Sequence, residues 1–115
     1  MLKWNKSILA AATATAILST AAFASASDMT TYDVTIDGAQ FTPSELKVKA
    51  GEPFRIKVTN KNKAPAEFES SDLDVEKLVP GTFDIVVNVR PQEPGKYEFF
   101  DDFRKNDVIG YIIAE

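Results

Sequence analysis

The sequence predicts an all-β fold, a Greek-key sandwich of seven to eight short strands, from three observations. Apolar and polar residues alternate through most of the chain after residue 27, the pattern of strands that bury one face. Turn signals such as Asp37-Gly38 and Pro94-Gly95 separate the alternating segments. Many short strands joined by turns are typical of a sandwich or a barrel.

The first three expected strands, residues 32–36, 46–48 and 54–58, alternate strictly between apolar and polar side chains. A glycine turn ends each of the first two, and the polar run at residues 60–63 ends the third. These strands should therefore each place one apolar row against the core.

The later strands are expected at residues 66–69, 83–89, 97–99 and 109–114. The last of them is a nearly continuous apolar run and should be a buried strand. Residues 72–78 begin with Asp and stop before Pro-Gly, which predicts a helix of about two turns at most. The residues expected in the core are Val34, Ile36, Phe54, Ile56, Val58, Phe68, Ile85, Val87, Tyr97, Phe99 and Ile112.

Residues 1–26 have the pattern of a secretory signal peptide. Two lysines precede an alanine-rich apolar run at residues 8–22, which is too short and too interrupted by hydroxyl residues to span a membrane. Small residues around Ala24 and Ala26 match the cleavage pattern. We therefore expect a periplasmic or secreted protein with one folded domain, residues 27–115, and no stable membrane insertion after the signal is removed.

The composition excludes several kinds of chemistry. The chain has no Cys and no His, which excludes disulfides, thiol nucleophiles, iron–sulfur clusters and the imidazole ligands of most copper and zinc sites. The net charge is -4, and all 17 acids follow the expected signal peptide. An acidic surface argues against nucleic acid as a partner and suits cations or basic partners.

The run from Phe41 to Phe54, FTPSELKVKAGEPF, resembles the opening strands of cupredoxin domains. Pro80-Gly81 and the run from Pro94 to Phe99, PGKYEF, match the same pattern in order. The resemblance covers nearly all of the expected mature chain and implies a cupredoxin-like β-sandwich. A type 1 copper site is excluded, because it needs two His and one Cys.

A narrower resemblance starts at Glu67, with the run EFES, and continues through the run YEFFDDF that ends at Phe103. These motifs are similar to small periplasmic proteins that accompany bacterial oxidase-dependent iron permeases, and to the N-terminal domain of EfeO-type iron-uptake proteins. The resemblance implies binding of iron or copper and an inner-membrane iron permease as partner. The subgroup is expected to carry His after the last Phe, where this chain has Arg104, and a guanidinium cannot ligate a metal.

Four carboxylates are candidate metal ligands: Glu67, Glu69, Asp101 and Asp102. Glu67 and Glu69 share one face of a strand, ~7 Å apart. In the resembled fold, the loop with Asp101 and Asp102 approaches that strand. Converging carboxylates favour a hard cation such as iron, manganese or calcium. The alternative is a solvated acidic surface in which Arg104 pairs with Asp102 or Glu69.

Three functions are compatible with these residues. The first is a periplasmic accessory protein of iron uptake that binds iron, or copper, through carboxylates and delivers it to a membrane permease. A ferroxidase step is the one enzymatic activity that the resemblance supports, and binding is favoured over catalysis because no second redox metal has ligands. The second is a metal-free interaction module that docks on a membrane or periplasmic partner. The third is a hydrolase with paired carboxylates, which a domain of this size rarely accommodates.

Overall fold

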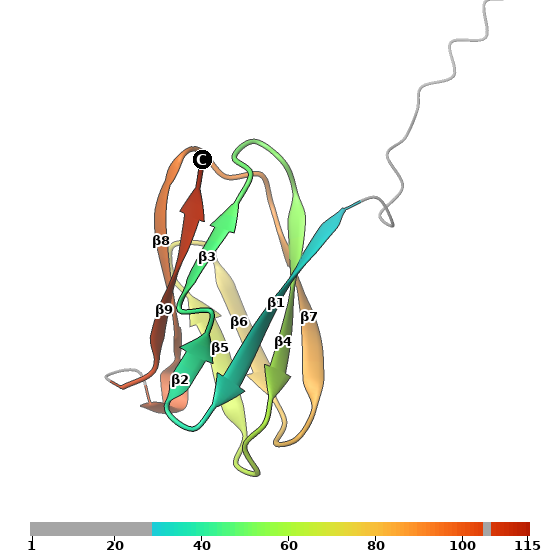
Figure 1. Cartoon of the computed structure of the whole chain (residues 1–115), viewed down its shortest axis with the longest axis vertical. Coiled ribbons are helices and arrows are strands. Elements are labelled where there is room, and N and C mark those ends of the chain that lie inside the picture. Colours follow the sequence, from blue (N-terminus) through green and yellow to red (C-terminus); the bar gives the residue numbers. More distant parts are fainter. Residues whose placement is uncertain (1–28, 105–106) are drawn as a thin grey trace, which may run out of the picture.

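The computed structural model describes residues 29–104 and 107–115, which form two β-sheets packed face to face (Figure 1). The expected signal peptide, residues 1–26, lies outside the described residues. No helix in the described part of the chain has the length and hydropathy needed to cross a membrane.

Nine strands are present among the described residues, and one 3-10 turn, η2, lies between the last two. The four-stranded sheet has the order β2-β1-β4-β7, and the five-stranded sheet has the order β3-β9-β8-β5-β6. The bounds are β1 Thr30–Asp37, β2 Gln40–Thr42, β3 Glu45–Val48, β4 Phe54–Asn60, β5 Ala66–Ser70, β6 Val75–Val79, β7 Asp84–Val89, β8 Gly95–Asp101, η2 Asp102–Arg104 and β9 Ile109–Ala114.

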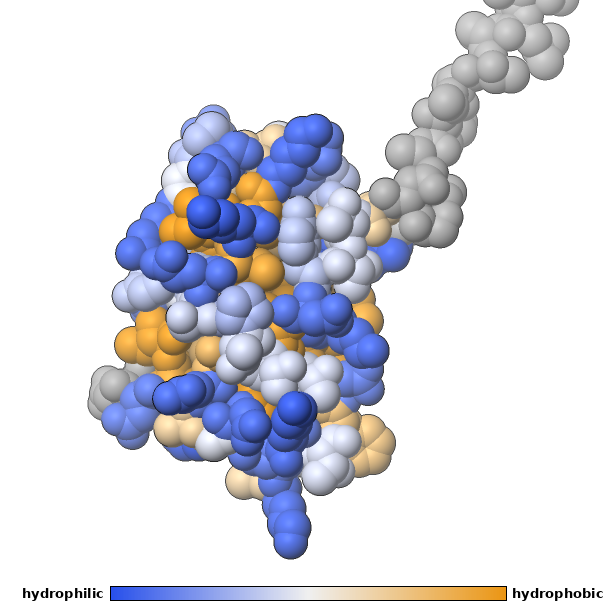
Figure 2. All heavy atoms as spheres, in the orientation of Figure 1, coloured by the Kyte–Doolittle hydropathy of each residue, from blue (hydrophilic) through white to orange (hydrophobic). Residues whose placement is uncertain are grey.

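The pairing confirms the predicted fold class. β1 pairs with β4 in parallel, and so does β3 with β9, while all other strand pairs are antiparallel. The sequence predicted seven to eight strands, and the described residues add two short ones, β2 and β6. Hydrophilic residues cover most of the face shown in Figure 2, with apolar patches between them.

The helix predicted at residues 72–78 is wrong, because this segment turns back and forms strand β6. Asp72, expected to start a helix, instead accepts a hydrogen bond from the Glu98 amide at 2.9 Å. Ser70 Oγ accepts one from the Leu73 amide at 3.2 Å, and Asp74 takes a positive φ of 55°. These contacts stabilise a turn after β5, and the following residues form backbone hydrogen bonds with β5. A helix of only two turns is marginally stable by itself, so the strand pairing is favoured.

The core lies between the two sheets and contains nine of the eleven residues expected there. The other two are only partly buried. Ile85 lies on β7, an edge strand, and the Tyr97 hydroxyl reaches the surface to donate to the Glu93 carbonyl at 2.7 Å. At the centre, the Phe99 ring lies 4.8 Å from Phe41 and 5.2 Å from Phe68.

Candidate functional site

A group of three carboxylates lies on the outer face of the five-stranded sheet. Glu67, Glu69 and Glu76 each offer a carboxylate oxygen, and these oxygens all lie within 4.8 Å of one another. Glu67 and Glu69 are half-buried on β5, and Glu76 is exposed on β6. We call these three residues the carboxylate group.

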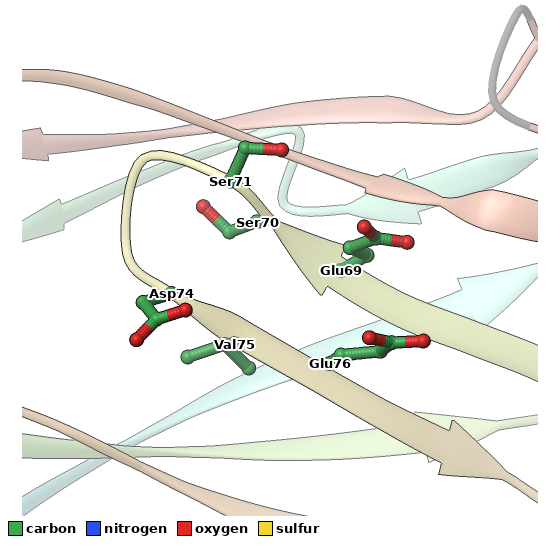
Figure 3. A pocket seen from close by; sticks show the side chains of 6 residues that line it. All are labelled: Glu69, Ser70, Ser71, Asp74, Val75 and Glu76. Carbon is green, nitrogen blue, oxygen red and sulfur yellow. The ribbon is translucent and has the colours of Figure 1, made fainter.

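The strand register explains why the group forms. Ala66, Phe68 and Ser70 face the core, so Glu67 and Glu69 face outward. Glu76 is paired directly with Glu69 across the β5–β6 hairpin, and paired residues project from the same face. Figure 3 shows the Glu69 and Glu76 side chains next to each other on their two strands.

Electrostatics within the group raise the pKa of Glu67 above its usual range. The main cause is a hydrogen bond between the Glu67 and Glu76 side chains. Burial of Glu67 and the negative charges of Glu76, Asp102 and Glu69 act in the same direction. Carboxylates that repel each other in this way favour a shared proton or a bound cation between them.

Asp101 supports the group from inside the sandwich. Its side chain is fully buried, because Asp101 is paired with Phe68 and shares that residue's inward face. Oδ1 accepts hydrogen bonds from the Glu67 amide at 3.0 Å and the Phe103 amide at 3.1 Å, and Oδ2 accepts one from Arg104 Nε at 3.2 Å. This carboxylate therefore ties β5 to the turn that follows β8.

The other predicted residues lie nearby. Asp102 begins η2, is half-buried, and is close enough for its charge to act on Glu67. Arg104 forms an ion pair with Asp101, a partner that the sequence analysis did not name. Thus Glu67 and Glu69 come together as predicted, whereas Asp101 and Asp102 are not members of the carboxylate group.

Glu76 is the member that the sequence analysis missed, since residues 72–78 were assigned to a helix. A signal for it exists in the sequence. The polar residues Ser70, Ser71 and Asp72 are typical of a hairpin turn, and a hairpin there would place a second strand beside β5.

A hollow of about 320 Å³ adjoins the group (Figure 3). Its lining residues are Glu69, Ser70, Ser71, Asp74, Val75 and Glu76. The carboxylates of Glu69, Asp74 and Glu76 thus border a space that is open to a cation. Oxygen ligands suit hard cations such as iron, manganese and calcium.

Comparisons with known proteins agree with this architecture. A family model described as the cupredoxin-like domain matches residues 7–114. The uncharacterized protein RP394 of Rickettsia prowazekii (strain Madrid E) is 36% identical over 81 residues, which are 70% of this chain and 65% of the relative's length.

Two solved structures share the fold at low sequence identity. The metal binding domain of the Cu(I)-exporting P-type ATPase CopA from Streptococcus pneumoniae D39 superposes with a TM-score of 0.64 at 16% identity, covering 74% of this chain and 84% of that one. Auracyanin A from Chloroflexus aurantiacus, a blue copper protein, superposes with a TM-score of 0.63 at 13% identity, covering 74% and 98%.

The blue-copper ligand set does not fit this chain, which has neither Cys nor His, so no type 1 copper site can form. The fold itself is shared with these structures over 74% of this chain, and the family model matches residues 7–114. The chain belongs to the cupredoxin-like domain family.

Proposed function

We propose that this protein binds a hard metal cation, with iron as the cargo, through Glu67, Glu69 and Glu76. The observation that supports the proposal is the convergence of three carboxylate oxygens within 4.8 Å, with a raised pKa at Glu67. A cation between the carboxylates would replace the shared proton and relieve their repulsion.

The chemistry of the donors favours iron over Cu(I). The CopA domain was solved with Cu(I), a soft cation that prefers thiolate and thioether ligands. This chain has no Cys, and its carboxylate group offers only oxygen. Iron and Mn²⁺ match oxygen ligands better, and Cu²⁺ serves as the comparator among copper ions.

The proposed setting is iron uptake outside the cytoplasmic membrane. The protein would be exported by its signal peptide, load iron at the carboxylate group, and deliver it to a permease in the inner membrane. An open site with three carboxylates suits delivery, because a ligand set exposed to solvent can exchange its cation. The proposal includes no oxidation step, because the described residues contain one group of three possible metal ligands and no second such group for another metal.

Isothermal titration tests the proposal, with Fe²⁺ under anaerobic conditions and with Mn²⁺ and Cu²⁺ as comparators. We expect binding of about one metal ion per chain, lost in Glu67→Gln and in Glu76→Gln. Glu45→Gln is the matched control, because Glu45 is exposed on β3 of the same sheet and lies outside the carboxylate group. Absence of binding, or equal loss in the control, would contradict the proposal.

A further inference from the structure

We propose that the outer face of the five-stranded sheet is a docking surface for a protein segment that combines basic and apolar side chains. This goes beyond metal binding, and it rests on the proposed function only for the idea that the protein has a partner. We call this surface the docking face and define it as Glu67, Glu69, Glu76, Leu78, Phe100 and Ile109.

The strand register places these residues in two adjacent rows. Glu76 is paired with Glu69, Glu69 with Phe100, and Phe100 with Ile109, so one row crosses four strands. Glu67 is paired with Leu78 in the next row. Residues paired across antiparallel strands project from the same face, so the acids on β5 and β6 adjoin Leu78 on β6 and Phe100 and Ile109 on β8 and β9 over one continuous surface.

The apolar members of the docking face are accessible. Leu78 is 57% exposed and Ile109 is 38% exposed, while Phe100 is half-buried and lies between Glu69 and Ile109 in its row. Leu78 lies on β6, on the other side of β5 from Phe100. Large apolar side chains gathered on an exposed sheet face mark interaction sites. Val86 on the other sheet is 52% exposed, but it is paired with Lys57, which forms an ion pair with Asp84, and it lies outside the carboxylate group.

Two hollows lined by acidic residues lie beside the docking face. One is the hollow next to the carboxylate group, and the second, of about 150 Å³, shares Ser71 with it. The acids that line them are Glu69, Asp72, Asp74, Glu76 and Glu98. A Lys or Arg side chain entering either hollow would meet carboxylates, while neighbouring apolar side chains of the same segment would cover Leu78 and Phe100.

Charge complementarity selects this occupant over others. A second copy docked through the same face would bring the two carboxylate groups together, and like charges at an interface are costly. An anionic lipid surface would be repelled for the same reason. Among the basic residues of this sheet, Arg104 pairs with Asp101 and Lys96 covers the Tyr111 ring at 4.1 Å. Lys77 lies between Glu76 and Leu78 on β6, but it is paired with the inward-facing Phe68 and therefore projects from the opposite face of the strand.

If metal binding also holds, the basic side chains of the partner and the metal use the same carboxylates. Docking would then weaken metal binding and favour release at the partner. The docking test is therefore run without metal, in the presence of a chelator. Failure of docking leaves the metal titration unaffected, and failure of the titration leaves docking unaffected.

The experiment is an NMR titration of the ¹⁵N-labelled protein with a peptide of alternating lysine and leucine. Two control peptides replace every lysine by glutamate or every leucine by serine. We expect shifts of amide signals on β5, β6, β8 and β9 with the lysine–leucine peptide only. Because the variant would place a hydroxyl where the peptide covers the apolar leucine side chain, Leu78→Ser should weaken binding about tenfold.

Matched variants locate the effect on the docking face. Glu76→Gln should weaken binding, whereas Glu45→Gln, the same change on β3, should not. Val86→Ser, an equally exposed apolar change on the other sheet, should leave binding unchanged. The side chains changed in these variants and in Leu78→Ser are all exposed, so each variant should be folded. A melting temperature close to that of the wild type would confirm this for each variant.

Several results would overturn the inference. Absence of binding by the lysine–leucine peptide, equal binding of the glutamate peptide, or an unchanged affinity in Leu78→Ser would each do so. Self-association that Leu78→Ser abolishes would assign the face to a second copy of the chain. Binding to phosphatidylglycerol vesicles that the same variant abolishes would assign it to a membrane.

Discussion

Asp101→Asn tests whether the buried carboxylate below the carboxylate group stabilises the fold. Asp101 has no exposed surface, and its two oxygens accept hydrogen bonds from the Glu67 amide, the Phe103 amide and Arg104 Nε. The asparagine side chain has nearly the same volume, so the change removes charge without opening a cavity. The substitution also replaces the charged oxygen that accepts from Arg104 with either the N–H₂ group or the neutral oxygen of the amide.

The magnitude follows from the three contacts. Hydrogen bonds to charged groups contribute about 1.5–3 kcal/mol each, against about 0.5–1.5 kcal/mol for neutral ones. Weakening the two amide bonds by about 1 kcal/mol each, and losing an ion pair of up to about 1 kcal/mol, gives a loss of about 2–3 kcal/mol. The ion pair is counted low because the Arg104 side chain is 37% exposed. For a domain of this size, the melting temperature should fall by roughly 8–24 °C.

Thermal unfolding followed by circular dichroism, without metal, measures the effect. Asp102→Asn is the control, because it removes the same charge from the next residue, which is only half-buried. The control should change the free energy of unfolding by less than about 0.5 kcal/mol. If Asp101→Asn melts within about 2 °C of the wild type, well below the fall worked out above, then Asp101 does not stabilise the fold as argued.

Three further predictions concern nearby residues. Gly110→Ala should destabilise the fold by about 1–3 kcal/mol in thermal melts, because the added Cβ would collide with the Phe99 ring. Glu67→Gln should melt at or above the wild-type temperature at pH 7, and the difference in melting temperature should shrink as the pH falls toward 4.5. The pKa of Glu67 is raised in the folded protein, so its ionised form destabilises the fold. Protonation of Glu67 on acidification removes this destabilisation from the wild type, whereas the variant has none to remove. A wild type that does not gain on the variant between pH 7 and 5 would contradict this. Arg104→His should lower stability by up to about 1 kcal/mol and add no metal affinity in the titration, because Arg104 pairs with Asp101.

Most of the fold could be predicted from local alternation. Residues such as Val34, Ile56 and Val87 face the core because each belongs to the row of alternate residues that is apolar in its strand. This alternation can be read from neighbouring residues in the sequence. Strand β6 could not be predicted in this way. Its apolar residues Val75, Leu78 and Val79 are spaced as in a helix, and only pairing with β5 makes the segment a strand.

In the candidate site too, local alternation predicted some contacts, whereas others depend on strand pairing. Glu67 and Glu69 share a face by local parity, so their proximity was predictable, whereas Glu76 joins them through the register of a hairpin. The burial of Asp101 was also within reach of the sequence. Asp101 lies two residues after Phe99 and four after Tyr97, so in a continuous strand all three side chains point to the same face. Because Tyr97 and Phe99 were expected in the core, an inward-facing carboxylate at Asp101 followed.

The central claim is that Glu67, Glu69 and Glu76 bind one hard cation. The most direct test adds Mn²⁺ below stoichiometric amounts to the ¹⁵N-labelled protein, because this paramagnetic ion broadens the NMR signals of the residues nearest to it. We predict that broadening centres on the amides of β5 and β6, and that it disappears in the double variant Glu67→Gln with Glu76→Gln. Broadening that is uniform, that centres elsewhere, or that persists in the double variant would contradict the claim.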